Sequence, residues 1–120
     1  MAVSKIEKTL TRGFKQIGQS GIISARGSWG TYSLSESIKN ESLYSVQIQS
    51  ANQIFGQIII PGSWLKGATI QNPIIIYRGS AAKSDSDNVY VAGNSDGYIN
   101  CYVGSILNDT VSLDVYEFFV

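Results

Sequence analysis

The sequence predicts an all-β fold, an antiparallel β-sandwich or a jelly-roll-like barrel with a short N-terminal helix or stem. About seven segments of β-forming residues follow one another at short spacing, separated by Gly, Pro, Asn and Asp. No helical period appears after residue 20. This pattern is typical of sandwiches and barrels built from antiparallel strands.

The length of the chain fits one domain. It has 120 residues and a mass of 13.0 kDa, enough to bury a modest core without disulfides or metals. We therefore expect residues 1–20 to form a helical stem or arm and residues 21–120 to form a β-sandwich head.

The first twenty residues have a different pattern from the rest. Apolar residues there fall at alternating three- and four-residue spacings, if Gly13 takes the missing position: Val3, Ile6, Leu10 and Ile17. This spacing predicts an amphipathic helix or a short coiled-coil stem. Such a short helix is marginal alone, and Gly13 costs about 1 kcal/mol relative to Ala, so it needs packing. An ordinary N-terminal segment lying on the sheet is the alternative.

The spacing changes to a period of two from Gly21 onward. Ile23, Ala25 and Trp29 alternate with polar residues, which predicts a first strand that ends near Gly30.

Two strong strand patterns follow. Tyr44, Val46 and Ile48 alternate with Ser and Gln, as expected of a strand with one solvent-facing side. The segment 54–60 comes directly after, so we expect a hairpin that ends at Pro61.

The second half of the chain continues the β pattern. Residues 62–73 are expected to form a loop, and 74–77 a buried strand stopped by Gly79. A hairpin is predicted across the Gly- and Asn-rich loop 93–97. In that hairpin, two valines face three apolar residues of the next strand: Val89 and Val91 against Ile99, Cys101 and Val103.

The final strand is apolar on both faces near its end. Val111, Leu113 and Val115 share one face, whereas Tyr116, Phe118 and Val120 make the other face apolar. A strand that is apolar on both faces needs a second cover, and a neighbouring subunit is the simplest one.

The composition excludes most catalytic chemistry. The chain has no His, so a Ser-His-Asp or Cys-His arrangement and the usual zinc ligand sets are absent. Cys101 is expected to be a small core residue. No cofactor fingerprint is present, and we expect no cofactor, no metal and no enzyme activity.

The charges of the chain balance, with nine basic and nine acidic residues, which disfavours nucleic acid and anionic membranes as partners. No apolar run is long enough to be inserted in a membrane.

The aromatic residues are the best candidates for a binding site. Several lie at expected strand ends or in loops beside Asn, Ser, Asp and Gln, which suits stacking on sugar rings and bonding to hydroxyls. Trp64 is the first choice and Trp29 the second, because both lie near glycines. Tyr98 and Tyr102 share a strand face that is either an interface or a binding surface. Packing in the core and in subunit contacts is the alternative for all of them.

The layout as a whole resembles small bacteriophage virion proteins, namely tail-fibre tips, baseplate receptor-binding heads and head fibres. The features are the amphipathic N-terminal segment, the Ser/Asn/Gly-rich β body without His and the apolar C-terminal strand. The resemblance implies a virion protein that is made in the host cytoplasm and forms a homotrimer. It also implies that this homotrimer contacts other virion proteins and binds host-surface glycans. A chain that is not viral is expected in the cytoplasm, since the first twenty residues contain no signal peptide.

A homotrimer also follows from the apolar positions. The expected subunit contact consists of the seam of the stem and the second face of the last strand: Ile6, Leu10, Ile17, Tyr116, Phe118 and Val120. Two other functions stay open, a structural assembly or decoration protein without a ligand and a small carbohydrate-active enzyme.

Overall fold

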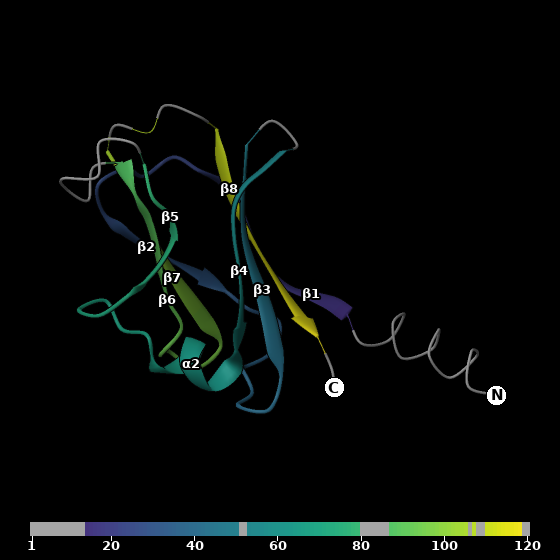
Figure 1. Cartoon of the computed structure of the whole chain (residues 1–120). Helices are drawn as coiled ribbons and strands as arrows, with labels where there is room; N and C mark the ends of the chain where they lie inside the picture. The colour runs from purple at the N-terminus through teal and green to yellow at the C-terminus, as the bar shows by residue number, and fades with distance from the viewer. Residues whose placement is uncertain (1–13, 51–52, 80–86, 106, 108–109, 119–120) are drawn as a thin grey trace.

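Two four-stranded antiparallel sheets pack face to face in the computed structural model of the chain (Figure 1). The structure describes residues 14–50, 53–79, 87–105, 107 and 110–118. The first sheet contains, in spatial order, β1 (Phe14–Ile23), β8 (Val111–Phe118), β3 (Leu43–Ser50) and β4 (Gln53–Pro61). The second contains β2 (Trp29–Ser33), β7 (Tyr98–Val103), β6 (Val89–Ala92) and β5 (Ile74–Tyr77). The predicted all-β sandwich is confirmed.

Alternate side chains of the strands fill the space between the sheets. Fully buried aliphatic residues come from strands of both layers: Val46, Ile48, Val89, Val91, Val111 and Val115. Burying each such side chain contributes about 1.5–3 kcal/mol relative to leaving it exposed. The period-two patterns therefore predicted the inward positions of β3, β6 and β8 correctly.

Both predicted hairpins are confirmed. In the hairpin of β3 and β4, Val46 lies opposite Ile58 and the pairing ends at Pro61. In the hairpin of β6 and β7, Val89 lies opposite Val103, and Val91 lies opposite Cys101.

The N-terminal prediction is wrong over residues 14–20, which belong to strand β1 (Phe14–Ile23) where a stem was expected. Ile17 is buried in the core and is not part of a stem seam. The register of β1 against β8 shifts between Gln16 and Gly18 and again between Gln19 and Ile22. These β-bulges add residues to the strand, so its inward positions lose the period of two. The expected strand from Gly21 to Gly30 is divided accordingly, since Ile23 ends β1 and Trp29 begins β2.

A short helix lies where the sequence predicts only a loop. Helix α2 (Gly62–Gly67) follows Pro61 directly and buries Leu65 completely. Six residues are too few for a helical period to stand out, so the expectation of one helix at most, within residues 1–20, is wrong here.

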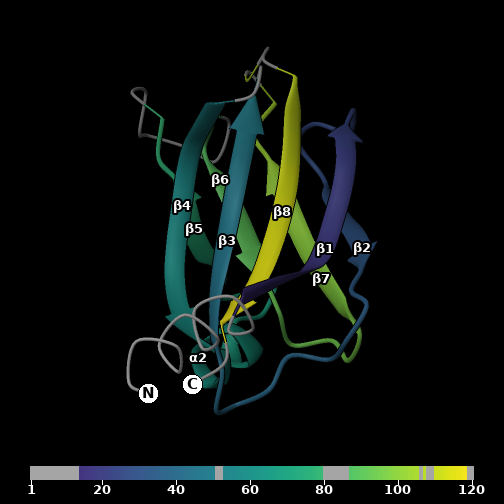
Figure 2. The same cartoon turned by 90° about the vertical axis from the view of Figure 1, so that its right-hand side faces the viewer.

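Strand β8 lies in the interior of its sheet, between β1 and β3 (Figure 2). Both of its edges are paired, so another copy of the chain can reach β8 only through side chains on its outer face. Tyr116 and Phe118 are half-buried on that face. Ile6, Leu10 and Val120 lie outside the described residues.

Candidate functional site

A hollow of ≈310 Å³ opens on the outer face of the sheet that contains β2, β7, β6 and β5. Three aromatic residues line it, one from each of three neighbouring strands: Trp29, Tyr102 and Tyr90. The loop between α2 and β5 supplies the remaining lining residues: Ile70, Gln71 and Pro73. The hollow therefore lies between a sheet face and an overhanging loop.

The three rings form a row across the sheet, which we call the aromatic row. Tyr102 lies directly opposite Trp29 on one side and Tyr90 on the other. The ring centroids are 5.7 Å apart for Trp29 and Tyr102 and 5.8 Å apart for Tyr90 and Tyr102. The ring planes are inclined by 53° and 61°, which lies within the favourable tilted range for aromatic pairs. Cross-strand pairing thus fixes the spacing of the rings.

A buried amide holds one end of the aromatic row. The Asn88 Nδ2 donates a hydrogen bond to the Tyr90 hydroxyl at 3.0 Å, and the Asn88 Oδ1 accepts one from the Gly79 backbone N–H at 3.0 Å. Asn88 is buried. Because its amide is bonded on both sides, the orientation of the Tyr90 ring is set before any ligand arrives.

The overhanging loop is closed by its own hydrogen bonds. The Thr69 N–H donates to the Asn72 carbonyl at 3.3 Å, and the Asn72 N–H donates to the Thr69 carbonyl at 3.1 Å and to the Thr69 hydroxyl at 3.0 Å. Ile70 and Gln71 form the exposed tip between them. The bonded turn limits the freedom of the backbone at Gln71, which lines the hollow together with the rings.

The lining residues supply binding contacts. The aromatic faces, the aliphatic Ile70 side chain and the Pro73 ring offer apolar surface, and Gln71 offers both a donor and an acceptor. Carboxylate, thiol and imidazole groups do not occur among the described residues that line this hollow. The arrangement is suited to a flat, hydroxyl-bearing ring that is apolar on its faces and polar at its edge.

The structure brings together two of the four ligand-binding residues predicted from the sequence. Trp29 and Tyr102 belong to the aromatic row, whereas Trp64 lines a neighbouring hollow of ≈280 Å³ together with Ile60 and Ile74. Pro73 lines both hollows.

The fourth predicted residue, Tyr98, lies at the opposite end of β7 from Tyr102 and pairs with Ser33. It is about half exposed and does not line the hollow of the aromatic row.

Sequence reasoning considered Tyr90 with the other aromatic residues but did not select it as a ligand-binding residue, and it did not identify the loop residues. The pairing of the hairpin contained the signal for Tyr90, because Val89 and Val91 point inward and the residue between them must point outward. The position of Gln71 over the row has no comparable signal, since it depends on how a loop folds back.

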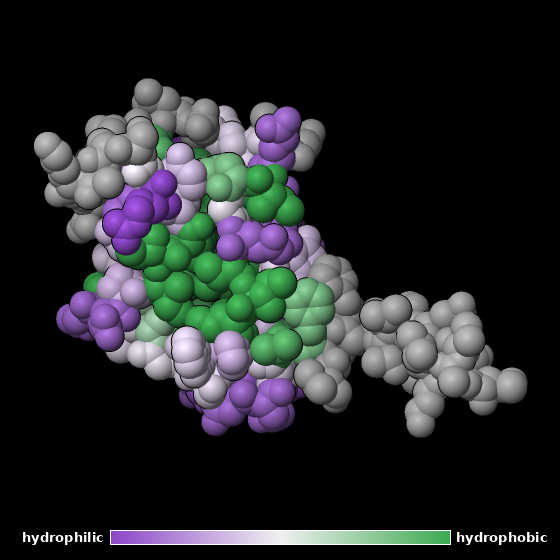
Figure 3. Space-filling view, viewed as in Figure 1, coloured by the Kyte–Doolittle hydropathy of each residue, from purple (hydrophilic) through white to green (hydrophobic). Residues whose placement is uncertain are grey.

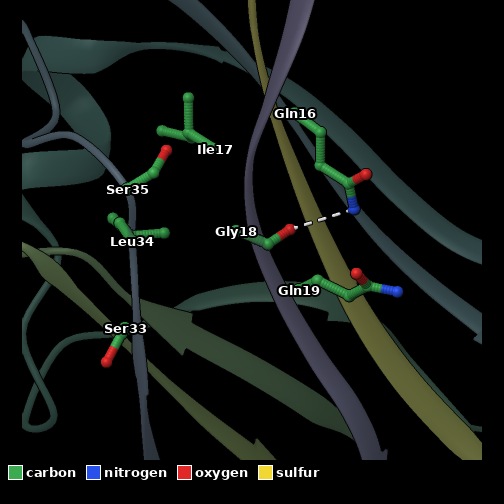
Figure 4. A pocket seen from close by; sticks show the side chains of 7 residues that line it. All are labelled: Gln16, Ile17, Gly18, Gln19, Ser33, Leu34 and Ser35. Atoms are coloured by element: carbon green, nitrogen blue, oxygen red, sulfur yellow. Dashed lines mark hydrogen bonds between the residues drawn. The ribbon is translucent and has the colours of Figure 1, made fainter.

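A hollow of ≈380 Å³ between β1 and the end of β2 has a different character. Figure 4 shows Gln16 and Gln19 on one side of β1 and Ile17, Leu34 and Ser35 on the other. It is lined by backbone and by aliphatic, amide and hydroxyl groups, without an aromatic ring or a charged group among its described lining residues. It offers fewer specific contacts than the aromatic row.

Two reactive groups elsewhere, the Cys101 thiol and the Glu117 carboxyl group, are buried. Burial raises the pKa of Cys101 to about 12, so its thiol stays protonated behind the aromatic row. The Glu117 side chain is fully buried and accepts a hydrogen bond from the Ser42 hydroxyl at 2.7 Å. Within the described ranges, no group of three or more acidic, Cys or His residues is placed to hold a metal ion.

Comparisons of the chain with protein families, with curated proteins and with solved structures find no match. Of the helical segments that the structure describes, none is long and apolar enough to cross a membrane.

Proposed function

We propose that this chain is a non-enzymatic binding module whose aromatic row receives a saccharide. The observation that supports this proposal is the row itself: three rings at 5.7 and 5.8 Å spacings in a hollow that Gln71 also lines. Sugar rings present C–H groups on their faces and hydroxyls at their edges, which match ring faces and an amide respectively.

We further propose that the chain binds this saccharide as part of a phage particle. The resemblance to receptor-binding phage proteins implies that the saccharide belongs to a host surface, and that several copies act together on one particle. Several copies also raise the overall avidity of a weak single site by bringing sites within reach of one surface. The homotrimer and the partnership with other virion proteins stay predictions.

A printed glycan array probed with the fluorescently labelled full chain tests the proposal. We expect the wild type to bind a subset of glycans, and isothermal titration with the best free oligosaccharide to give its affinity. Trp29→Ala should weaken that affinity at least tenfold, because losing roughly 100 Å² of apolar contact costs more than about 1.4 kcal/mol. Tyr90→Ala should weaken it similarly.

Trp64→Ala is the matched control for the aromatic row. It removes an indole of the other hollow and should leave the titrated affinity within about twofold. Circular dichroism checks that each variant keeps its strands. Absence of binding on the array, or binding that survives both Trp29→Ala and Tyr90→Ala, would contradict the proposal.

A ligand-free structural or decoration role is the second candidate. It is favoured by a broad apolar surface on the side of the sandwich where β4 and β5 lie, which is typical of a contact with another protein. In that case the array stays empty while the chain still assembles.

A further inference from the structure

The sandwich has two sides where the edge strands of the two sheets lie next to each other, and the core is covered to different degrees on these sides. On the side of β1 and β2, an isolated bridge joins Gly18 to Leu34, and the Ser35 N–H donates to the Ile17 carbonyl at 2.7 Å. An ion pair between Lys15 and Glu36 lies over the same side. Backbone bonds and an ion pair therefore join the two sheets there, although the hollow between β1 and the end of β2 opens on the same side.

The opposite side, where β4 and β5 are the edge strands, is less closed. No backbone hydrogen bond joins β4 to β5 among the residues that the structure describes. The hydrophobic residues here that pack against the core are only partly buried: Phe55, Ile58, Ile74 and Tyr77. The hydrophobic core thus continues to the surface between these two strands.

Exposed apolar side chains continue this surface. Among the residues that the structure describes, eight large hydrophobic ones are exposed, and five of these belong to β4, α2, the loop 68–73 and β5: Ile54, Ile59, Trp64, Ile70 and Ile75. We call this surface the β4–β5 side, and Figure 3 shows it as a continuous apolar area facing the viewer. Contiguous apolar patches larger than a few hundred Å² are rare on monomers and mark interaction sites.

The β4–β5 side is also almost free of charge. From Gln53 to Tyr77 the only charged residue is Lys66, and the whole chain has a formal net charge of zero. A charged partner would find no complementary group on this surface, whereas a second copy presents the same neutral apolar area without like-charge repulsion.

We propose that the β4–β5 side is the contact surface between copies of this chain. Two copies related by a two-fold axis contact each other through the same patch on each copy. Such a contact is closed, because neither copy keeps an exposed patch to which a third copy could bind. Specific interfaces bury roughly 800 Å² on each partner. The partly buried Phe55, Ile58 and Ile74 provide the apolar centre of such an area. Ile59 and Ile75 flank this centre on the outer faces of the two sheets, since they lie opposite Ser45 and Tyr90.

The contact also protects a strand edge. The outer edge of β4, a nine-residue strand with no charged side chain, is not paired with any described strand. Natural sheets protect such edges with charges, prolines within the strand or a covering element, because a bare edge pairs with other chains. Strand β4 has a bulge at Phe55 and ends at Pro61, but residues 57–60 between them carry neither a charge nor a proline. A second copy covers this part of the edge.

Light scattering behind a sizing column tests the proposal on the full chain. We expect a discrete oligomer for the wild type and a shift toward the monomer for Ile59→Lys, with at least a tenfold increase in the dissociation constant. Ile59 is 63% exposed and so can accept Lys without unfolding the domain.

Ile22→Lys is the matched control. Ile22 is 72% exposed and lies on β1, the opposite edge strand of the same sheet. It should leave the oligomer intact. A wild-type chain that is monomeric up to about 1 mM overturns the proposal. So does an oligomer that resists Ile59→Lys, because its contact then lies elsewhere, as in the stem predicted from the sequence.

Tryptophan fluorescence gives an independent measurement at the surface itself. In Trp29→Phe, Trp64 is the only tryptophan left, and it is 71% exposed in the single chain. Its emission should move to shorter wavelength as concentration rises, since association removes water from the indole. Adding Ile59→Lys should abolish this shift. An emission maximum that does not change with concentration overturns the proposal.

Discussion

The Ser42 hydroxyl and the Glu117 carboxylate form a 2.7 Å hydrogen bond inside the sandwich, where Glu117 is 0% exposed. The Lys39 ammonium lies 3.6 Å from the same carboxylate oxygen, Oε2. A buried carboxylate is costly without partners, so this pair holds the segment before β3 against the end of β8.

We therefore predict that Ser42→Ala lowers the free energy of unfolding by about 1–3 kcal/mol, because it leaves a buried carboxylate with one partner fewer. Urea unfolding followed by circular dichroism measures the loss. Ser35→Ala, at an exposed position, is the control and should change stability by less than about 0.5 kcal/mol. Equal stability of the two variants would show that the bond contributes nothing.

The two ends of helix α2 should respond oppositely to the same substitution. A Cβ at Gly62 would lie 1.7 Å from the Lys39 carbonyl oxygen, whereas a Cβ at Gly67 would meet no atom within 4 Å. Gly62→Ala should cost about 3 kcal/mol or more, since backbone has to move. Gly67→Ala should be neutral or stabilise by up to about 1 kcal/mol. Thermal melts of both variants decide, and similar melting temperatures would contradict the close approach.

Asp114 gives stability a defined dependence on pH. It lies on the outer face of β8 and accepts hydrogen bonds from the amides of Gln16 and Gln49. Burial raises the pKa of Asp114 above its ordinary value of 3.8, although the bonds from Gln49 and Gln16 oppose this rise. The folded chain therefore binds this proton more tightly than the unfolded chain.

The contribution of Asp114 to stability is largest below pH 3.8 and falls as the pH rises through the folded-state pKa. Asp114→Asn removes this loss, so its free energy of unfolding minus that of the wild type should increase with pH above 3.8. Urea unfolding at a series of pH values measures the difference. A difference that is constant or decreases with pH would argue against a raised pKa.

Cys101 should react with a thiol reagent only when the chain opens. Its thiol is buried and its pKa is raised to about 12, so neither access nor thiolate is available near pH 8. We expect Ellman's reagent to label the native chain at least about 100-fold more slowly than the unfolded chain. Ser105→Cys adds an exposed thiol to the same chain and should react in a fast first phase. Fast labelling of the native wild type would place Cys101 at the surface.

The sequence was most informative where strands pair with close neighbours. The alternation in residues 44–48 and the turn at 50–53 predicted the hairpin of β3 and β4, and the same reasoning predicted β6 and β7. These elements follow from local rules, since side-chain period and turn residues act within a few positions.

The errors arose where tertiary contacts override the local pattern. Because of the bulges of β1, Gln19 and Gly21 are exposed although they lie at alternate positions between the buried Ile17 and Ile23. Helix α2 is too short to show a period of its own.

The candidate site was predicted only in part for a related reason. Trp29 and Tyr102 were identified as aromatic residues, but their neighbours across the sheet depend on strand order, which the sequence does not specify. The loop that brings Gln71 over the rings is placed by the packing of α2 and by its own turn.

The position of β8 between β1 and β3 has a consequence for synthesis on the ribosome. Strand β8 is the neighbour of both β1 and β3 in the sheet. The sheet of β1, β3 and β4 therefore stays incomplete until residues 111–118 have emerged. Pairing across such long sequence separations is slow because the chain closes a large loop first. The exposed faces of the early strands are therefore a natural substrate for chaperones during translation, and slowing elongation before residue 111 should increase the demand for them.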